Sequence, residues 1–326
     1  GMMRRLLTVL TAVFLSAGLL RPVLFVQAEE VINCWDETKK AHYLRRRVST
    51  AINIYSKEGT IPRVNHESGW YSGVEYDILR VSPDENTFLK VDYSESPKYL
   101  NALYDRDLME AGYIRVGGIN AGYFANSGSE YGRPVGAVRV NNEWTLWHGK
   151  ENTPSYGNGY ATVYFNTYDM EIRYHGWKNG QWKGDPDWSF WTGYLIEAEN
   201  AVSGSYTWFV DGEEKDITGG QFGMVNYRVY GRALTILAQD EEGNFLLLEF
   251  YGTMKESAVV QFLREHHVRD AIRLDGGGSC QMVYDDELVN LDFPERQKTN
   301  GIPVMFDRMA AAWKRVSWSL EEDGGD

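Results

Sequence analysis

The sequence predicts an α+β fold: a mixed, mainly antiparallel β-sheet core with a few helices, in a single domain. Runs in which apolar and polar residues alternate, as in half-buried strands, clearly outnumber runs with helical spacing. Aromatic residues, which are enriched in strands, make up 14% of the 326 residues. No internal repeat of fixed period is visible, and a hydrophobic content of 43% is enough for a well-buried core.

The N-terminus has the pattern of an export signal. Two arginines precede an apolar run over residues 6–20, and a small-residue cleavage site follows at Val26-Gln27-Ala28. We therefore expect residues 1–28 to be a signal peptide and the protein to be secreted or extracytoplasmic. The alternative is an uncleaved membrane anchor, which the apolar patch at 22–26 favours and which Arg21 weakens by interrupting the run.

The next segment, residues 29–64, is basic and poor in large apolar residues. Its run Arg45-Arg46-Arg47 indicates a solvated linker or a short helical segment. We place the domain boundary near Arg63, so residues 65–310 form the predicted domain and residues 311–326 an acidic C-terminal tail.

The first predicted elements of the domain are two strands and a helix. Residues 74–81 and 87–91 alternate, and Ser82-Pro83-Asp84-Glu85-Asn86 between them is a turn sequence, which predicts a β-hairpin. Apolar residues at helical spacing then predict a helix over residues 96–108.

A strand over 113–119 follows, and it delivers the polar segment Asn120-Ala121-Gly122-Tyr123-Phe124 to a loop at its end. Residues 135–140 and 144–147 form a second predicted hairpin across two asparagines. Residues 148–192 are rich in Trp, Tyr, Gly and Asn, which indicates β-hairpins with long surface loops.

The last third contains the most strand-like runs of the chain. Residues 206–210 begin one predicted hairpin, and residues 227–238 and 245–251 form another across an acidic turn. A helix over 257–267 has one apolar face, and a short strand over 271–274 ends at a glycine-rich loop. The predicted order is strand, helix, strand, glycine loop.

Composition and motifs exclude several functions. A net charge of −13 argues against nucleic-acid binding, which needs clustered Lys and Arg. The two cysteines, Cys34 and Cys280, form no disulfide framework and no zinc pattern. No Gly-x-Ser-x-Gly elbow, Ser-His-Asp order or Walker loop is present. His266 and His267 sit where the helix dipole favours histidine, so we assign them no catalytic role.

The strongest chemical signal is a carboxylate followed by three glycines and a serine at a strand end. Glycines let backbone amides approach an anion closely, and the serine adds a donor, so such a loop can hold a phosphate. The loop consists of Asp275, Gly276, Gly277, Gly278 and Ser279. The alternative is a purely structural turn in which the aspartate caps its own loop.

Two further polar residues stand at predicted strands. The Asn120 amide can donate and accept hydrogen bonds, and Arg232 can bind phosphate in bidentate fashion. Arg232 can equally pair with a carboxylate such as Glu249 on a neighbouring strand.

The succession of these motifs over residues 73–306 resembles the phosphodiester glycosidase family, which includes the enzyme that uncovers mannose 6-phosphate. The matching segments are Asn120–Phe124, Pro134–Gly136, Ser203–Gly204, Arg232–Ala233 and Asp275–Ser279, of which only the last is an unbroken match. The chain departs from the family at three positions: Ala121 replaces a usual glycine, Ala233 a common threonine, and Tyr251 an aspartate.

The resemblance implies hydrolysis of a sugar 1-phosphodiester, on a phosphate-linked cell-surface or extracellular glycan. The catalytic residues it implies are Asp275, Arg232 and Asn120. The residues implied to bind substrate or phosphate are Gly122, Ser203, Gly204, Gly276, Gly277, Gly278 and Ser279. Asp275 would be an acid/base or a nucleophile at the anomeric centre, and Arg232 with the loop amides would offset the phosphate charge.

The competing hypothesis is a non-catalytic carbohydrate-binding or envelope polysaccharide assembly module, in which the Trp and Tyr residues of 144–208 stack on sugars. The expected partner is in either case a carbohydrate, with association to the cell envelope and no nucleic acid. No cofactor is required by the sequence, and a divalent cation near Asp275 stays open because no ligand spacing demands one.

Overall fold

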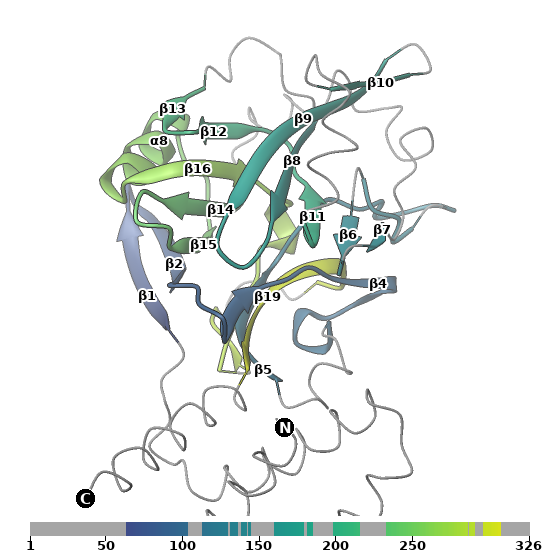
Figure 1. Ribbon diagram of the computed structural model, residues 1–326, viewed down its shortest axis with the longest axis horizontal. Coiled ribbons are helices and arrows are strands. Elements are labelled where there is room, and N and C mark those ends of the chain that lie inside the picture. Colours follow the sequence, from purple (N-terminus) through teal and green to yellow (C-terminus); the bar gives the residue numbers. More distant parts are fainter. Residues whose placement is uncertain are drawn as a thin grey trace, which may run out of the picture. The chain divides into compact units, whose positions relative to one another are not determined.

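The computed structural model describes residues 63–103, 113–129, 131–135, 138–141, 143–144, 160–178, 181–184, 198–215, 233–285, 287–290 and 296–307. Nearly all of them belong to one compact unit, Ile61–Asp105 together with Arg115–Phe306, drawn as coloured ribbon in Figure 1. The predicted signal peptide, nearly all of the predicted linker, the acidic tail and Arg232 lie outside the described residues.

A seven-stranded antiparallel sheet carries the central strands of the fold. Its strands are, in spatial order, β1 (Val64–Tyr71), β2 (Val74–Val81), β15 (Phe245–Phe250), β14 (Leu234–Asp240), β16 (Val268–Arg273), β12 (Thr207–Val210) and β13 (Glu213–Glu214). Every residue of β14 and β15 is buried, because both faces of these central strands are covered.

One face of this sheet is covered by the α-helix α8 (Glu256–Glu265), as Figure 1 shows. The helix presents Val259, Phe262 and Leu263 to the core, and the Phe262 ring contacts the Phe250 ring edge-on with centroids 5.0 Å apart. Full burial of each such side chain is worth about 1.5–3 kcal/mol. The helix therefore connects β15 to β16 and is held to the sheet by an apolar face.

Two further sheets complete the described part. A six-stranded antiparallel sheet contains, in spatial order, β10 (Gln181–Gly184), β9 (Met170–Lys178), β8 (Tyr160–Phe165), β11 (Asn200–Ser203), β6 (Val138–Val140) and β7 (Glu143–Trp144). The other contains β18 (Glu287–Leu288), β17 (Met282–Tyr284), β5 (Tyr113–Asn120), β19 (Lys298–Asp307) and β3 (Thr87–Leu89), with β4 (Asp92–Lys98) paired to β19.

The prediction of a sheet-rich, mainly antiparallel core is confirmed. The hairpins β6–β7, β12–β13 and β14–β15, the helix α8 and the strand before the glycine loop all form where the sequence predicts them. The helical elements of the described residues are α8 and the 3-10 turns η1 (Leu100–Ala102) and η3 (Gly277–Ser279).

Two local predictions are wrong. The segments 74–81 and 87–91 are strands but not a hairpin, because β2 pairs with β1 and β15 while β3 pairs with β19 of another sheet. The turn between them exists, with Asp84 Oδ1 accepting from the amides of Asn86 and Thr87 at 2.8 and 2.7 Å, but it carries the chain from one sheet to the next. The start of the helix expected over 96–108 is also wrong, because β4 continues through Lys98, while residues 104–108 of that prediction lie outside the described residues.

Among the described residues, no helix is both long and apolar enough to cross a membrane.

Candidate functional site

The glycine loop lies where strands of two sheets come together. The Asp275 amide donates to the Ala121 carbonyl at the end of β5, and the Gly277 amide donates to the Ala233 carbonyl at the start of β14, both at 2.8 Å. A side chain at Gly276 would place a Cβ 2.4 Å from the Ala233 oxygen, and Gly277 has a positive φ of 59°. The loop therefore needs glycine at both positions in order to fit between the two strands.

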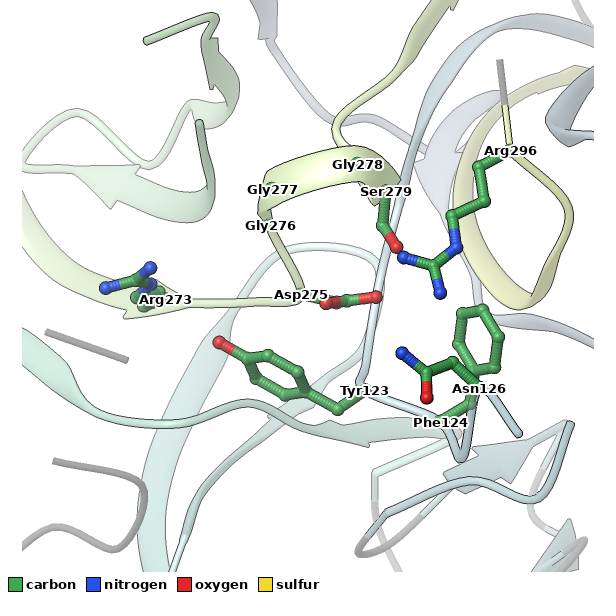
Figure 2. A pocket seen from close by; sticks show the side chains of 10 residues that line it. All are labelled: Tyr123, Phe124, Asn126, Arg273, Asp275, Gly276, Gly277, Gly278, Ser279 and Arg296. Carbon is green, nitrogen blue, oxygen red and sulfur yellow. The ribbon is translucent and has the colours of Figure 1, made fainter. Parts of the chain in front are cut away.

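A pocket of about 100 Å³ opens over this loop (Figure 2). Its lining residues are Tyr123, Phe124, Asn126, Arg273, Asp275, Gly276, Gly277, Gly278, Ser279 and Arg296. Figure 2 shows the side chains of Asp275, Asn126 and Arg296 turned toward a common space, with Arg273 on the opposite side of Asp275. The sequence-predicted aspartate, the whole glycine loop and the serine thus share one pocket.

The environment of Asp275 makes it a proton-transfer group near neutral pH. Burial raises the pKa of its carboxyl from 3.8 to about 6, and this rise is limited by a hydrogen bond from Ser279, by the cations Arg296 and Lys298, and by the Gly276 amide. A carboxyl with a pKa near the working pH can act as base or acid, and it is still ionised at pH 7.

Arg296 supplies positive charge beside the loop. Its guanidinium carbon lies 5.8 Å from the centroid of the Phe124 ring, and its Nη1 would be 3.6 Å from a Cβ built on Gly278. Within the described residues, the Gly278 amide has no hydrogen-bond partner. The exposed amide and the guanidinium therefore border the same part of the pocket, which suits an anion.

Arg273 is the second cation of the pocket, and it is buried. Its Nη1 donates to the Tyr206 hydroxyl at 2.7 Å, and Tyr206 in turn donates to Glu256 at 2.8 Å. Trp208 Nε1 donates to the other Glu256 oxygen at 2.7 Å. This series of bonds links the pocket wall to the first turn of α8, where a carboxylate is also favoured by the helix dipole.

Asn120 lies directly behind the loop and is 1% exposed. Its Nδ2 donates to the Asp275 carbonyl at 2.6 Å, and its Oδ1 accepts from the Gln281 amide at 3.0 Å and from the Thr235 hydroxyl at 3.1 Å. These contacts fix both sides of the loop. The predicted direct contact of Asn120 with substrate stays a prediction.

Gly122, Ser203 and Gly204 cluster together beside the pocket, although none of them lines it. A Cβ at Gly122 would be 2.8 Å from the Ser203 carbonyl, and a Cβ at Gly204 would be 2.1 Å from the Arg273 carbonyl. The Ser203 hydroxyl is buried and shares a 2.8 Å hydrogen bond with Thr162. In this structure Gly204 allows close packing against Arg273 and Gly122 allows close packing against Ser203, and the predicted role of the three residues in binding substrate stays a prediction.

Arg296, Arg273 and Asn126 are pocket residues that the sequence did not single out, and Tyr123 and Phe124 were noticed only as part of a motif. The signal for Arg273 was available, because it ends β16 and stands only two residues before Asp275. Arg296 had no local signal, since it precedes β19 and reaches the loop only through the tertiary fold.

No group of three or more His, Cys, Asp and Glu side chains that could hold a metal occurs in the part of the chain that the structure describes. His266 is packed at the end of α8, where its Nδ1 lies 2.8 Å from the Phe262 carbonyl and its ring stacks on Phe262.

Comparisons with known proteins bear on the family and on the fold of the chain. The family model described as phosphodiester glycosidase matches residues 113–305. The catalytic domain of zebrafish N-acetylglucosamine-1-phosphodiester alpha-N-acetylglucosaminidase, auto-inhibited by its pro-peptide, is similar with a TM-score of 0.51 and 16% identity, over 76% of this chain and 85% of that one. This likeness shows a shared fold.

A hypothetical protein from Synechocystis gives a TM-score of 0.49 at 13% identity, over 74% of this chain. The present chain spans 62% of the length of that protein. A search of curated proteins gives no match.

Proposed function

Because this chain belongs to the phosphodiester glycosidase family, we propose that it hydrolyses a sugar 1-phosphodiester, releasing the sugar and leaving a phosphomonoester on the other partner. The observation that carries the proposal is the pairing, in one pocket, of a carboxyl whose pKa is about 6 with a guanidinium beside a glycine loop. The first suits acid–base work at a sugar carbon, and the second suits a phosphodiester anion.

The phosphate is expected to lie between the Gly278 amide and Arg296. Both are donors that border the same part of the pocket. A volume of about 100 Å³ is well below the roughly 300–1,000 Å³ of a pocket that encloses a drug-sized ligand. The pocket therefore accommodates the phosphate and the reacting atoms, while the rest of the glycan stays outside.

Asp275 acts best as a base or a nucleophile. The leaving phosphomonoester has a second pKa of about 6, so it departs without strong help from an acid. In the base role, the Asp275 carboxylate takes a proton from water as the water oxygen bonds to C1 and the bond from C1 to the phosphate oxygen breaks. In the nucleophile role, the carboxylate itself bonds to C1 as the bond from C1 to the phosphate oxygen breaks and the phosphomonoester leaves, and water later attacks C1 and releases the sugar from the carboxylate.

Arg232 keeps its predicted role as a second phosphate ligand in this proposal. The next residue in the chain, Ala233, accepts a hydrogen bond from the Gly277 amide, so Arg232 directly precedes a residue that contacts the glycine loop. The proposed substrate is a phosphate-linked surface or extracellular glycan, reached by export through the signal sequence at residues 1–28.

The non-catalytic alternative depended on aromatic stacking platforms. Of the described aromatic residues in 144–208 with known burial, Tyr164, Phe165, Tyr206 and Trp208 are at most 1% exposed, and only Tyr168 is exposed, at 53%. The first four rings belong to the packed core and are not available as stacking platforms.

The test is hydrolysis of a panel of sugar 1-phosphodiesters by the purified chain, with the released sugar and phosphomonoester measured separately. Asp275→Asn and Arg296→Gln should each abolish or strongly reduce turnover. The matched control is Arg264→Gln, because the Arg264 side chain is 53% exposed on α8, where it pairs with Glu214. Incorporation of labelled oxygen from water into the sugar identifies cleavage of the C–O bond, whereas label in the phosphate identifies P–O cleavage. Glycan binding without turnover in the wild type would refute the proposal.

A further inference from the structure

A buried polar cluster lies behind the glycine loop, on the side away from the pocket. Its members Asn120, Thr235, Glu249 and Cys280 come from β5, β14, β15 and the end of the loop, and each is at most 1% exposed. The proposed reaction uses none of the last three. Buried polar groups are costly unless they are hydrogen-bonded, so their arrangement requires an explanation.

The hydrogen-bond directions in this cluster can be assigned by counting protons. Asn120 Nδ2 faces the Asp275 carbonyl at 2.6 Å, and a carbonyl only accepts, so the amide orientation is fixed and Oδ1 faces Thr235. The Thr235 hydroxyl has one proton but faces two oxygens, Asn120 Oδ1 at 3.1 Å and Glu249 Oε2 at 2.7 Å. The hydroxyl also faces the Cys280 thiol at 3.2 Å, whose proton cannot lie between either pair of oxygens.

An ionised Glu249 would take that one proton. Thr235 Oγ1 and Asn120 Oδ1 would then face each other at 3.1 Å with no proton between them, although both residues are at most 1% exposed. A protonated Glu249 removes the conflict, because its own O–H donates to Thr235 and the threonine donates to Asn120. Only this assignment makes both contacts attractive.

The electrostatic surroundings of Glu249 favour the neutral acid. Burial raises the pKa of the carboxyl well above its usual value, and the neighbouring carboxylate Asp77 on β2 raises it further. Hydrogen bonds from Cys280 and Thr235 and the charge of Lys298 on β19 act in the opposite direction without cancelling the rise. Lys298 is itself occupied by the Gln281 side chain and the Arg296 carbonyl.

We propose that Glu249 is a positioning residue that stays protonated and begins a one-way series of hydrogen bonds, from Glu249 to Thr235, to Asn120 and to the Asp275 carbonyl, which fixes the glycine loop. The series ends on the backbone of the residue that carries the reacting carboxylate. If the backbone of Asp275 shifts, its carboxylate moves with it, and small displacements of a reacting group reduce turnover strongly. The kinetic part of this inference rests on the proposed function, but the protonation state does not.

The protonation state is tested by infrared spectroscopy of the full chain at pH 8 without substrate. The expected spectrum contains a C=O band of a protonated carboxylic acid, which Glu249→Gln removes and which [13C]glutamate labelling of the wild type shifts. Asp275 cannot supply this band, because a carboxyl with a pKa of about 6 is ionised at pH 8. Labelling needs no substitution, so the result holds even if the variant fails to fold. Absence of a shifted band overturns the proposal.

The positioning role is tested by variants that keep or remove the donors. Thr235→Val should lower kcat about tenfold with KM unchanged, which is the size of one neutral hydrogen bond. Thr235→Ser and Glu249→Gln retain a donor at each position and should stay within about threefold of the wild type. The control is Thr207→Val, a completely buried threonine of the same sheet. Two results would overturn the positioning role: an equal loss of kcat in Thr235→Val and Thr207→Val, or a Glu249→Gln variant that is folded but inactive. If neither the wild type nor any variant hydrolyses a phosphodiester, the proposed function is wrong, but the infrared test of the protonation state remains valid.

Discussion

The unusual pKa of Asp275 predicts that this residue destabilises the folded protein at neutral pH. The carboxyl titrates at about 6 in the folded protein and near 3.8 when unfolded, so the protonated form favours folding. Its stabilising contribution is complete below pH 3.8 and is lost as the pH rises through about 6. The full difference between the two pKa values corresponds to an upper bound of about 3 kcal/mol.

Asp275→Asn removes this titration while keeping nearly the same shape. The free energy of unfolding of the variant minus that of the wild type should therefore increase by about 1–3 kcal/mol from pH 4 to pH 7.5. The prediction concerns how this difference changes with pH and not its size at one pH. The Asn amide is a poorer acceptor for the Ser279 hydroxyl and the Gly276 amide, and this lowers the stability of the variant at every pH.

The measurement is urea unfolding followed by tryptophan fluorescence, with the free energy of unfolding of wild type and variant compared at both pH values. Glu199→Gln is the matched control, because it makes the same kind of change, from carboxylate to amide, at an exposed residue. A difference between wild type and Asp275→Asn that is the same at pH 4 and pH 7.5 would refute the buried-carboxylate explanation, whatever the substrate proves to be.

Three further results are expected. The wild-type kcat/KM should rise with pH through about 6, because Asp275 acts as the carboxylate, and a rate that falls over that range would contradict the base or nucleophile role. Arg296→Gln should lower kcat/KM by about 100-fold or more while Arg264→Gln leaves it unchanged, since a charge-assisted contact to phosphate is lost in only one of them. Gly276→Ala should unfold at clearly lower urea, because its Cβ would meet a backbone oxygen at 2.4 Å, whereas Gly278→Ala, with its nearest atom at 3.6 Å, should remain as stable as the wild type.

Local signals predicted the elements that are themselves local. The hairpin β14–β15 and the helix α8 each depend on residues close in the sequence, namely a turn at Asp240–Asn244 and an apolar face on 256–265, and both form as predicted. The failed hairpin at 74–91 had an equally good turn sequence. A turn bends the chain, but it does not determine which strand becomes the partner. β2 pairs with β15, which lies more than 160 residues later in the chain.

The candidate site shows the same division between local and tertiary information. The loop from Asp275 to Ser279 was visible as a motif, because a run of glycines after a carboxylate is unusual enough to be noticed. Arg296 was not visible, because its proximity to Gly278 arises from the return of the chain into β19 beside β5. Tyr251 illustrates the opposite case: the sequence showed it as a departure from the family, and in the structure it stands beside Asp77 and Glu249.

Asn120 shows why a motif identifies a residue more readily than it identifies the task of that residue. An amide at a strand end next to a predicted phosphate loop suggested contact with the substrate. In the structure its donor and its acceptor are both occupied by the protein, by the Asp275 carbonyl on one side and by Thr235 and Gln281 on the other. Replacement by Asp would put a second acceptor against that carbonyl, so Asn120→Asp should disturb the loop even in the absence of substrate. Loss of thermal stability in Asn120→Asp without ligand would support this structural role. An unchanged stability with a raised KM would instead indicate that Asn120 contacts the substrate.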